Sequence, residues 1–316
     1  MPTTRKRATV AESFRKWRES LDLFGAVKAG DRELVRRLID AGSDIKERDD
    51  LGHTALFWAT REGHPGSRES IVSLLIEKGG VNLCEARTND GSTSLIAAAV
   101  HGHESIARQL LGVVGADRGG VHARNTYGAT ALVAAAKQGH ESTARLLIEN
   151  GSDVNAKTLK GITPLVASSW NGHESVVRLL LEKGADVNAE DASGNTVIMM
   201  AAKRGHESIA RLLLENGSDV GRGRKSALLC AALSGHVPTI RLLIEKRNES
   251  VKDDDPDTKK ENAAALMAAA NSGCEEAFHA ILTGPRMTTS RSNISAAVQT
   301  LMKKVKEKQN TPVRDH

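Results

Sequence analysis

The chain has 316 residues, enough for one large domain or two ordinary ones, and 40% of them are hydrophobic, so it can bury a core. Only 3% are aromatic, which favours a core of small aliphatic side chains and argues against aromatic-lined platforms for nucleic acids. The net charge of +5 is concentrated at the ends: residues 1–18 carry +5 and residues 287–316 carry +4, which leaves −4 for residues 19–286. The body of the chain is therefore mildly acidic, and we expect it to make no direct contact with nucleic acid.

Targeting and cysteine patterns point to the inside of the cell. No uncharged apolar run approaches the roughly 18 residues that a membrane span needs, and no apolar segment follows the basic N-terminal residues. The three cysteines are far apart, which supports neither a disulfide framework nor a zinc ribbon, and Cys84 is expected to be the exposed one. We expect a monomer in the cytoplasm or the nucleus, with no cofactor.

Residues 1–18 are predicted to form a basic amphipathic helical extension. Thr9 and Glu12 have the spacing of a capping box, and apolar residues follow at helical spacing. The helix is expected to cover the first unit of the chain. Three alternatives stay open: contact with an anionic membrane, a weak nuclear signal at residues 5–7, and a mitochondrial presequence, which Glu12 and Glu19 oppose.

A repeated unit with a period of 33 residues in its best copies fills the body of the chain. The pair Gly-His recurs six times, beginning at Gly63, Gly102, Gly139, Gly172, Gly205 and Gly235. A Gly-x-Thr turn precedes each of the first five copies at a constant offset, and the sixth keeps only Ser226 at the threonine position. Self-similarity at a fixed period is typical of repeat architectures, in which each unit packs on the next.

Residues 158–190 show the local physics of one unit. A threonine at the N-cap and a proline at the first helical position predict a short helix over residues 164–171, which ends at Gly172. Neither this helix nor the next is long enough to be stable alone, so each unit must bury its apolar face on its neighbours. The second helix, over about residues 173–183, is expected to place five side chains inward: Val176, Val177, Leu179, Leu180 and Leu181.

These features resemble the ankyrin-repeat family. The matching segments include GITPLVASSWNGHESVVRLLLEKGADVNA at residues 161–189 and GATALVAAAKQGHESTARLLIENGSDVNA at residues 128–156. The resemblance implies an all-α fold: an ankyrin-repeat solenoid of stacked helix–turn–helix units with protruding turns, in about seven to eight repeats including caps. In that family a histidine of the Thr-Pro-Leu-His element links neighbouring turns, but here that position is apolar in every copy, so we expect looser turn tips with fewer polar ties.

The resemblance also divides the chain into an array at residues 19–284 and a Lys-rich C-terminal helix and tail at residues 285–316. A charged segment at residues 246–261 has no apolar face and is predicted to be a loop. On the C-terminal helix, a stripe of four apolar residues is expected to cap the array: Ile294, Val298, Leu301 and Val305. The repeat copies are expected near residues 19–48, 49–87, 88–124, 125–157, 158–190, 191–220, 221–245 and 262–284.

The sequence predicts no catalytic or metal-binding constellation. Stacked helices lie about 8–10 Å apart, which is too far for the six repeated histidines to converge on one metal ion, so each is expected to pack at the start of its second helix. The segment at residues 221–226 lacks the glycine that must precede the lysine of a phosphate-binding loop. We therefore expect no enzyme activity.

The family resemblance implies where a partner binds, because the variable positions of the family are the turn tips and the exposed end of each first helix. The candidate partner-binding residues are Tyr127, Lys137, Gln138, Leu159, Lys160, Trp170, Asn171, Lys203 and Arg204. Tyr127 and Trp170 stand out, since aromatic residues are rare in this chain and common at interface hot spots. The resemblance further implies possible hydroxylation at Asn155 and Asn188; the alternative is that each asparagine bonds its own turn.

These residues favour a non-catalytic adaptor or scaffold. Its partner is expected to be another protein or peptide, with some acidic character, bound on the concave face and turn tips. One alternative is a regulator of transcription or of a nucleic-acid-associated complex, which acts through the basic tails. Another is a targeting subunit of an enzyme complex whose catalytic partner is a separate chain.

Overall fold

The computed structural model describes residues 22–114, 120–220, 226–250, 256–284 and 289–309. The chain divides into two compact units, Met1–Asp153 and Val154–His316. Within the described ranges all regular structure is helical apart from one isolated bridge between Glu190 and Thr196, so the predicted all-α class is confirmed. No helix in these ranges combines the length and apolar character needed to cross a membrane.

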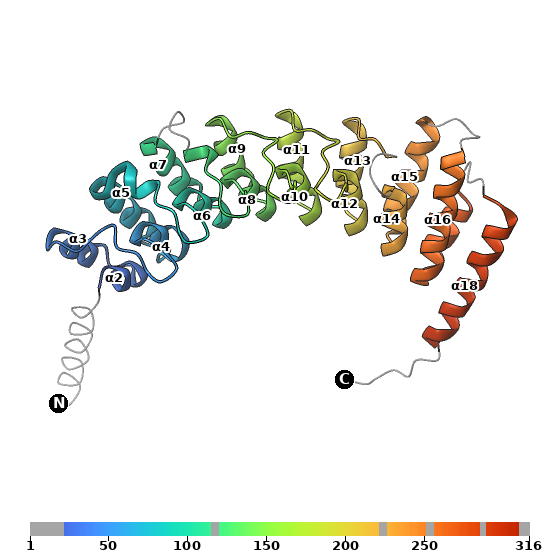
Figure 1. Cartoon of the computed structure of the whole chain (residues 1–316), viewed down its shortest axis with the longest axis horizontal. Helices are drawn as coiled ribbons and strands as arrows, with labels where there is room; N and C mark the ends of the chain where they lie inside the picture. Colours follow the sequence, from blue (N-terminus) through green and yellow to red (C-terminus); the bar gives the residue numbers. More distant parts are fainter. Residues whose placement is uncertain (1–21, 115–119, 221–225, 251–255, 285–288, 310–316) are drawn as a thin grey trace, which may run out of the picture. The chain divides into compact units, whose positions relative to one another are not determined.

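The first unit is a stack of helix pairs in which first helices pack on first helices and second helices on second helices (Figure 1). The first helices are α2 (Leu23–Ala29), α4 (Ala55–Glu62), α6 (Ser94–His101) and α8 (Ala131–Gln138). The second helices are α3 (Arg32–Asp40), α5 (Arg68–Cys84), α7 (Glu104–Val114) and α9 (Glu141–Glu149), and a short 3-10 helix covers Gly120–His122.

The second unit repeats this arrangement and ends with one further helix (Figure 1). Its first helices are α10 (Pro164–Asn171), α12 (Val197–Arg204), α14 (Ala227–Ser234) and α16 (Pro256–Ser272). Its second helices are α11 (Glu174–Glu182), α13 (Glu207–Glu215), α15 (Val237–Ser250) and α17 (Glu275–Leu282), and α18 (Arg291–Gln309) follows. The described residues of the two units thus form eight helix pairs, within the predicted number of repeats.

Local capping chemistry sets the helix limits. The Oγ1 atom of Thr163 accepts a hydrogen bond from the backbone N–H of Val166 at 3.2 Å, and Gly172 ends α10 with φ +82°, so the predicted helix over residues 164–171 is confirmed. The second helix of this unit is one residue shorter at each end than predicted. Four of its five predicted inward side chains are buried, but Leu181 is half-buried.

The charged segment 246–261 is not the loop that the sequence predicts. Helix α15 continues through Ser250 and helix α16 begins at Pro256, so most of the segment is helical, while residues 251–255 lie outside the described part. Proline suits the first position of a helix, and charged side chains can occupy the first turns where they face the solvent. Lys259 and Lys260 are accordingly exposed on the first turns of α16.

Of the two predicted terminal extensions, the C-terminal one lies largely within the described residues. The helix predicted over residues 1–18 lies outside the described residues. Near the other end, α18 packs against α16 with Ala297 buried. The four residues of the predicted apolar stripe, Ile294, Val298, Leu301 and Val305, are half-buried.

The turn tips are held together by polar ties, contrary to the prediction. The backbone N–H of Asn89 donates to the carbonyl of Leu51 at 3.0 Å, and that of Thr126 donates to the carbonyl of Asp90 at 2.8 Å. In the second unit, the N–H of Ala192 donates to the carbonyl of Lys160 at 2.9 Å. Backbone groups thus make the links for which the apolar side chains at the histidine position are unsuited.

Candidate protein-binding surface

The exposed ends of the first helices carry six of the candidate residues. Lys137 and Gln138 end α8 in the first unit and are exposed. In the second unit, Trp170 and Asn171 end α10, and Lys203 and Arg204 end α12. The side chain of Asn171 is directed back to its own helix, since its Nδ2 atom donates to the carbonyl of Ala167 at 2.8 Å.

Three of these residues form a compact group, the Trp170 cluster, which consists of Trp170, Lys203 and Arg204. The Cζ atom of Arg204 lies 4.1 Å from the centroid of the Trp170 ring, and the Nζ atom of Lys203 lies 5.4 Å from it. Cations at these distances are attracted by the electrons of an indole face. The cluster therefore combines a half-buried aromatic ring on one repeat with two exposed positive charges on the next repeat.

The backbone at Trp170 is fixed while its indole N–H stays available. The Nε2 atom of His206 lies 3.3 Å from the carbonyl oxygen of Trp170, which ties the end of α10 to the next repeat. Burial lowers the pKa of His206, so the ring is neutral at physiological pH. Among the described residues, Trp170 Nε1 donates no hydrogen bond.

The candidate residues at the turn tips are exposed. Tyr127 is 67% exposed in the first unit, and Leu159 is 77% exposed in the second, beside the exposed Lys160. Tyr127, Lys137 and Gln138 belong to the first unit, whereas the Trp170 cluster belongs to the second.

Asn155 and Asn188 bridge consecutive hairpins of the second unit. The Oδ1 atom of Asn155 accepts from the backbone N–H of Asp186 at 2.8 Å, and the Oδ1 atom of Asn188 accepts from that of Asp219 at 2.9 Å. Their Nδ2 atoms donate across to the carbonyls of Gly184 and Gly217, each at 3.4 Å. Both asparagines thus bond the next hairpin, and their hydroxylation remains a prediction.

Sequence reasoning missed a second aromatic group, the Trp58 cluster, which consists of Trp58, Lys28 and Arg61. The Nζ atom of Lys28 lies 4.0 Å from the centroid of the Trp58 ring and the Cζ atom of Arg61 lies 5.8 Å from it. A signal was present in the sequence, because Trp58 occupies a position where the other copies have smaller residues. Those residues are Gly25, Ala97, Ala134, Ala167, Met200, Cys230 and Ala268.

The repeated histidines join neighbouring repeats. The Nε2 atom of His140 lies 3.1 Å from the carbonyl of Val100, and that of His236 lies 3.2 Å from the carbonyl of Lys203. His103 instead accepts from Arg68, whose Nη1 atom lies 2.7 Å from its Nε2 atom. No three His, Cys, Asp or Glu residues in the described ranges are placed to hold a metal ion.

The partial burial of His103 predicts that the stability of the array depends on pH. Burial, Arg68 and His101 lower the pKa of His103 to about 4. As the pH falls, His103 in the unfolded chain therefore becomes protonated near pH 6.5, whereas in the folded chain it stays neutral until the pH is near 4. The free energy of unfolding should therefore fall as the pH drops from about 6.5 to about 4. His103→Gln should reduce this fall, as measured by urea unfolding at about pH 7 and about pH 5; an unchanged pH dependence would contradict the assignment.

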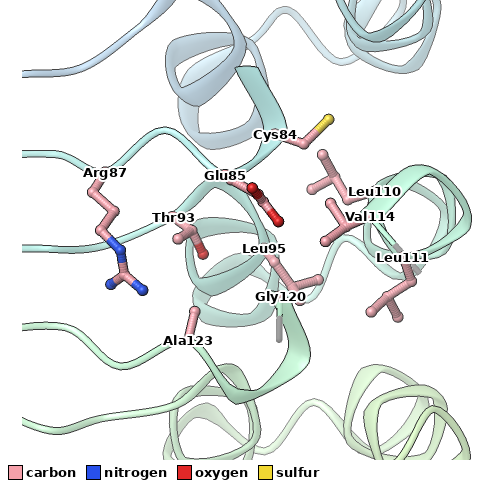
Figure 2. Close-up of a pocket in the computed structure, with 10 residues that line it drawn as sticks. All are labelled: Cys84, Glu85, Arg87, Thr93, Leu95, Leu110, Leu111, Val114, Gly120 and Ala123. Carbon is pink, nitrogen blue, oxygen red and sulfur yellow. The ribbon is translucent and has the colours of Figure 1, made fainter. Parts of the chain in front are cut away.

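A pocket of about 270 Å³ lies in the first unit and is lined in part by leucine side chains. Arg87 lies on the opposite side of it from Leu110 and Leu111 (Figure 2). Cys84 lines it too, and the prediction of an exposed thiol there is wrong. The chain kinks at Gly80, which has a non-helical φ of +62°, and the helical residues after the kink bury Cys84. This burial, with Glu85, raises the pKa of the thiol to about 11. Two lining residues border residues 115–119, which lie outside the described part, so no ligand is assigned to this pocket.

Comparison with known proteins identifies the family. Residues 23–118, 114–191, 151–224 and 198–296 match the family model for ankyrin repeats (3 copies). The chain therefore belongs to the ankyrin-repeat family, as its sequence predicts. Ankyrin repeats generally mediate interactions between proteins.

Two known proteins are similar to parts of this chain. The crystal structure of the ankyrin repeat domain of Bcl-3, a member of the IkappaB protein family, is similar with a TM-score of 0.58 and 30% identity, over 67% of this chain and 94% of that chain. The E3 ubiquitin-protein ligase XBAT33 of Arabidopsis thaliana is 38% identical over 88 residues. That segment is 28% of this chain and 16% of the ligase, so the match covers a small part of the relative's length.

Proposed function

We propose that the protein is a non-catalytic adaptor or scaffold of the cytoplasm or nucleus, which binds an acidic segment of a partner protein at the Trp170 cluster. The observation that carries this proposal is the placement of Arg204 and Lys203 around the half-buried Trp170 ring. Tryptophan and arginine are the residues most enriched at interface hot spots. A ring flanked by two cations suits a segment that presents a carboxylate beside an apolar side chain.

The free indole N–H and the fixed backbone add to this chemistry. Trp170 Nε1 can donate to a carboxylate or carbonyl of the partner, a contact that an apolar residue at this position would lack. The carbonyl of Trp170 is bonded by His206, so the ring is presented from a helix end that is already ordered. Little conformational entropy is then lost on binding, which favours affinity.

Replacing Trp170 with alanine tests this function. We expect Trp170→Ala to weaken partner binding by about 2 kcal/mol or more, close to a thirtyfold rise in Kd, while the fold is kept. Wild type and variant are compared by affinity purification, and Kd is then measured for each captured protein. Met302→Ala removes another exposed apolar side chain of the same unit, 61% exposed on α18, and should leave Kd unchanged. Equal capture and equal Kd for wild type and Trp170→Ala would refute the proposal.

The similarity to a ubiquitin ligase favours a second candidate function. In this version the array is the targeting subunit of an enzyme complex, and it selects the protein on which a separate catalytic chain acts. The shared 88 residues support a common role in recognition. This version predicts that a catalytic chain copurifies with the wild-type protein. The Trp170→Ala variant should then retain the catalytic chain and lose the recognised protein.

A further inference from the structure

The carboxylate of Asp49 organises one turn tip and one tryptophan of the first unit. Its Oδ1 atom accepts from the backbone N–H of Leu51 at 3.0 Å and from that of His53 at 2.8 Å. Its Oδ2 atom accepts from His53 Nδ1 at 2.9 Å and from Trp58 Nε1 at 2.8 Å. Burial opposes the charge, but these bonds prevail and lower the pKa of Asp49 to about 2, so the network is intact at neutral pH.

This network holds Trp58 against the stacked rings of His53 and Phe57. The ring of His53 stacks on that of Phe57 with centroids 4.7 Å apart and meets the Trp58 ring edge-on at 5.3 Å. His53 and Phe57 are buried, whereas Trp58 is half-buried. The indole is thus locked in place by groups behind it without being covered by them.

Two cationic side chains and an exposed leucine lie close to Trp58 or to its turn network. Lys28 lies over the ring and Arg61 lies near it. Leu51, which Asp49 holds in the same turn network, is 59% exposed. Two carboxylates lie close to these groups. Asp49 accepts four hydrogen bonds, and Glu62 lies 3.3 Å from Arg61 in an exposed pair, which contributes little energy and which a carboxylate of a partner can replace.

We propose that Leu51 and the Trp58 cluster form a second docking surface, which binds an acidic peptide segment of a partner protein. A carboxylate of the segment faces Lys28 and Arg61, and an apolar side chain of the segment covers Leu51 and the indole of Trp58. The two cations supply the charge complementarity, and the Asp49 network supplies the order before binding. This surface lies in the first unit and does not depend on the Trp170 cluster of the second.

Single-tryptophan variants of the full chain test the two surfaces separately. Trp17→Phe with Trp170→Phe leaves Trp58 as the fluorescent reporter, and Trp17→Phe with Trp58→Phe leaves Trp170. The probe is a synthetic peptide of alternating glutamate and leucine, and its control has glutamine in place of glutamate. We expect a saturable change in Trp58 emission with the acidic probe, and a much weaker one with the neutral control.

Charge reversal completes the test. Lys28→Glu and Arg61→Glu in the Trp58 reporter should each raise the Kd for the acidic probe by about tenfold or more. Arg36→Glu makes the same charge change at an exposed site on the second helix α3 and should have little effect. No saturable Trp58 signal, an equal response to the neutral peptide, or equal effects of Lys28→Glu and Arg36→Glu would each overturn the proposal. The Trp170 reporter is read independently, so either surface can fail while the other stands.

Discussion

Gly172→Ala is expected to lower the free energy of unfolding by about 3 kcal/mol, from two separate penalties. Gly172 has φ +82°, a left-handed conformation that costs an alanine about 1–2 kcal/mol. A Cβ atom at this position would lie 2.7 Å from Cε1 of His206, well inside van der Waals contact. The ring would have to move, which strains or breaks its bond to the carbonyl of Trp170. Urea unfolding followed by circular dichroism measures the loss.

A matched control separates the two penalties. Gly184 also has φ +82°, but no atom lies within 4 Å of a Cβ built there, so Gly184→Ala should cost only the backbone term of about 1–2 kcal/mol. In a His206→Ala background, the cost of Gly172→Ala should fall to that same level, because the ring that it meets is gone. Equal losses for Gly172→Ala and Gly184→Ala in the wild-type background would show that the glycine–histidine contact carries no energy.

This contact explains why Gly and His recur together in the sequence. The glycine ends one first helix, and the histidine of the following repeat lies against that glycine and bonds the backbone near it. The packing at the junction between repeats thus accounts for the identity of both residues. Local signals of this kind, together with threonine caps, made the repeat fold predictable from sequence. The segment 246–261 was not predictable in the same way, because its charge and lack of an apolar face favour a loop, whereas exposed charged residues also occur on the helical turns of α16.

The candidate site was predictable only in part. The repeat register predicted Trp170, Lys203 and Arg204 as candidates. Their mutual distances depend on side-chain rotamers, which the register does not determine. Trp58 was not predicted because it lies outside the variable positions of the family, although it stands where the other copies have smaller residues. Its partner Asp49 could not be found from spacing alone, since the bond spans a turn whose geometry comes from folding.

Leu180→Ala should lower the free energy of unfolding by about 3 kcal/mol, whereas Leu181→Ala should lower it by less than about 1 kcal/mol. The two leucines are adjacent on α11, and hydropathy alone places both inside. A helix of nine residues turns by about 100° per residue, however, so three consecutive leucines cannot all face the same neighbours. Leu180 is fully buried and Leu181 is half-buried beside it. Urea unfolding of both variants measures the difference; equal losses would mean that the burial of this helix face does not decide the stability of the second unit.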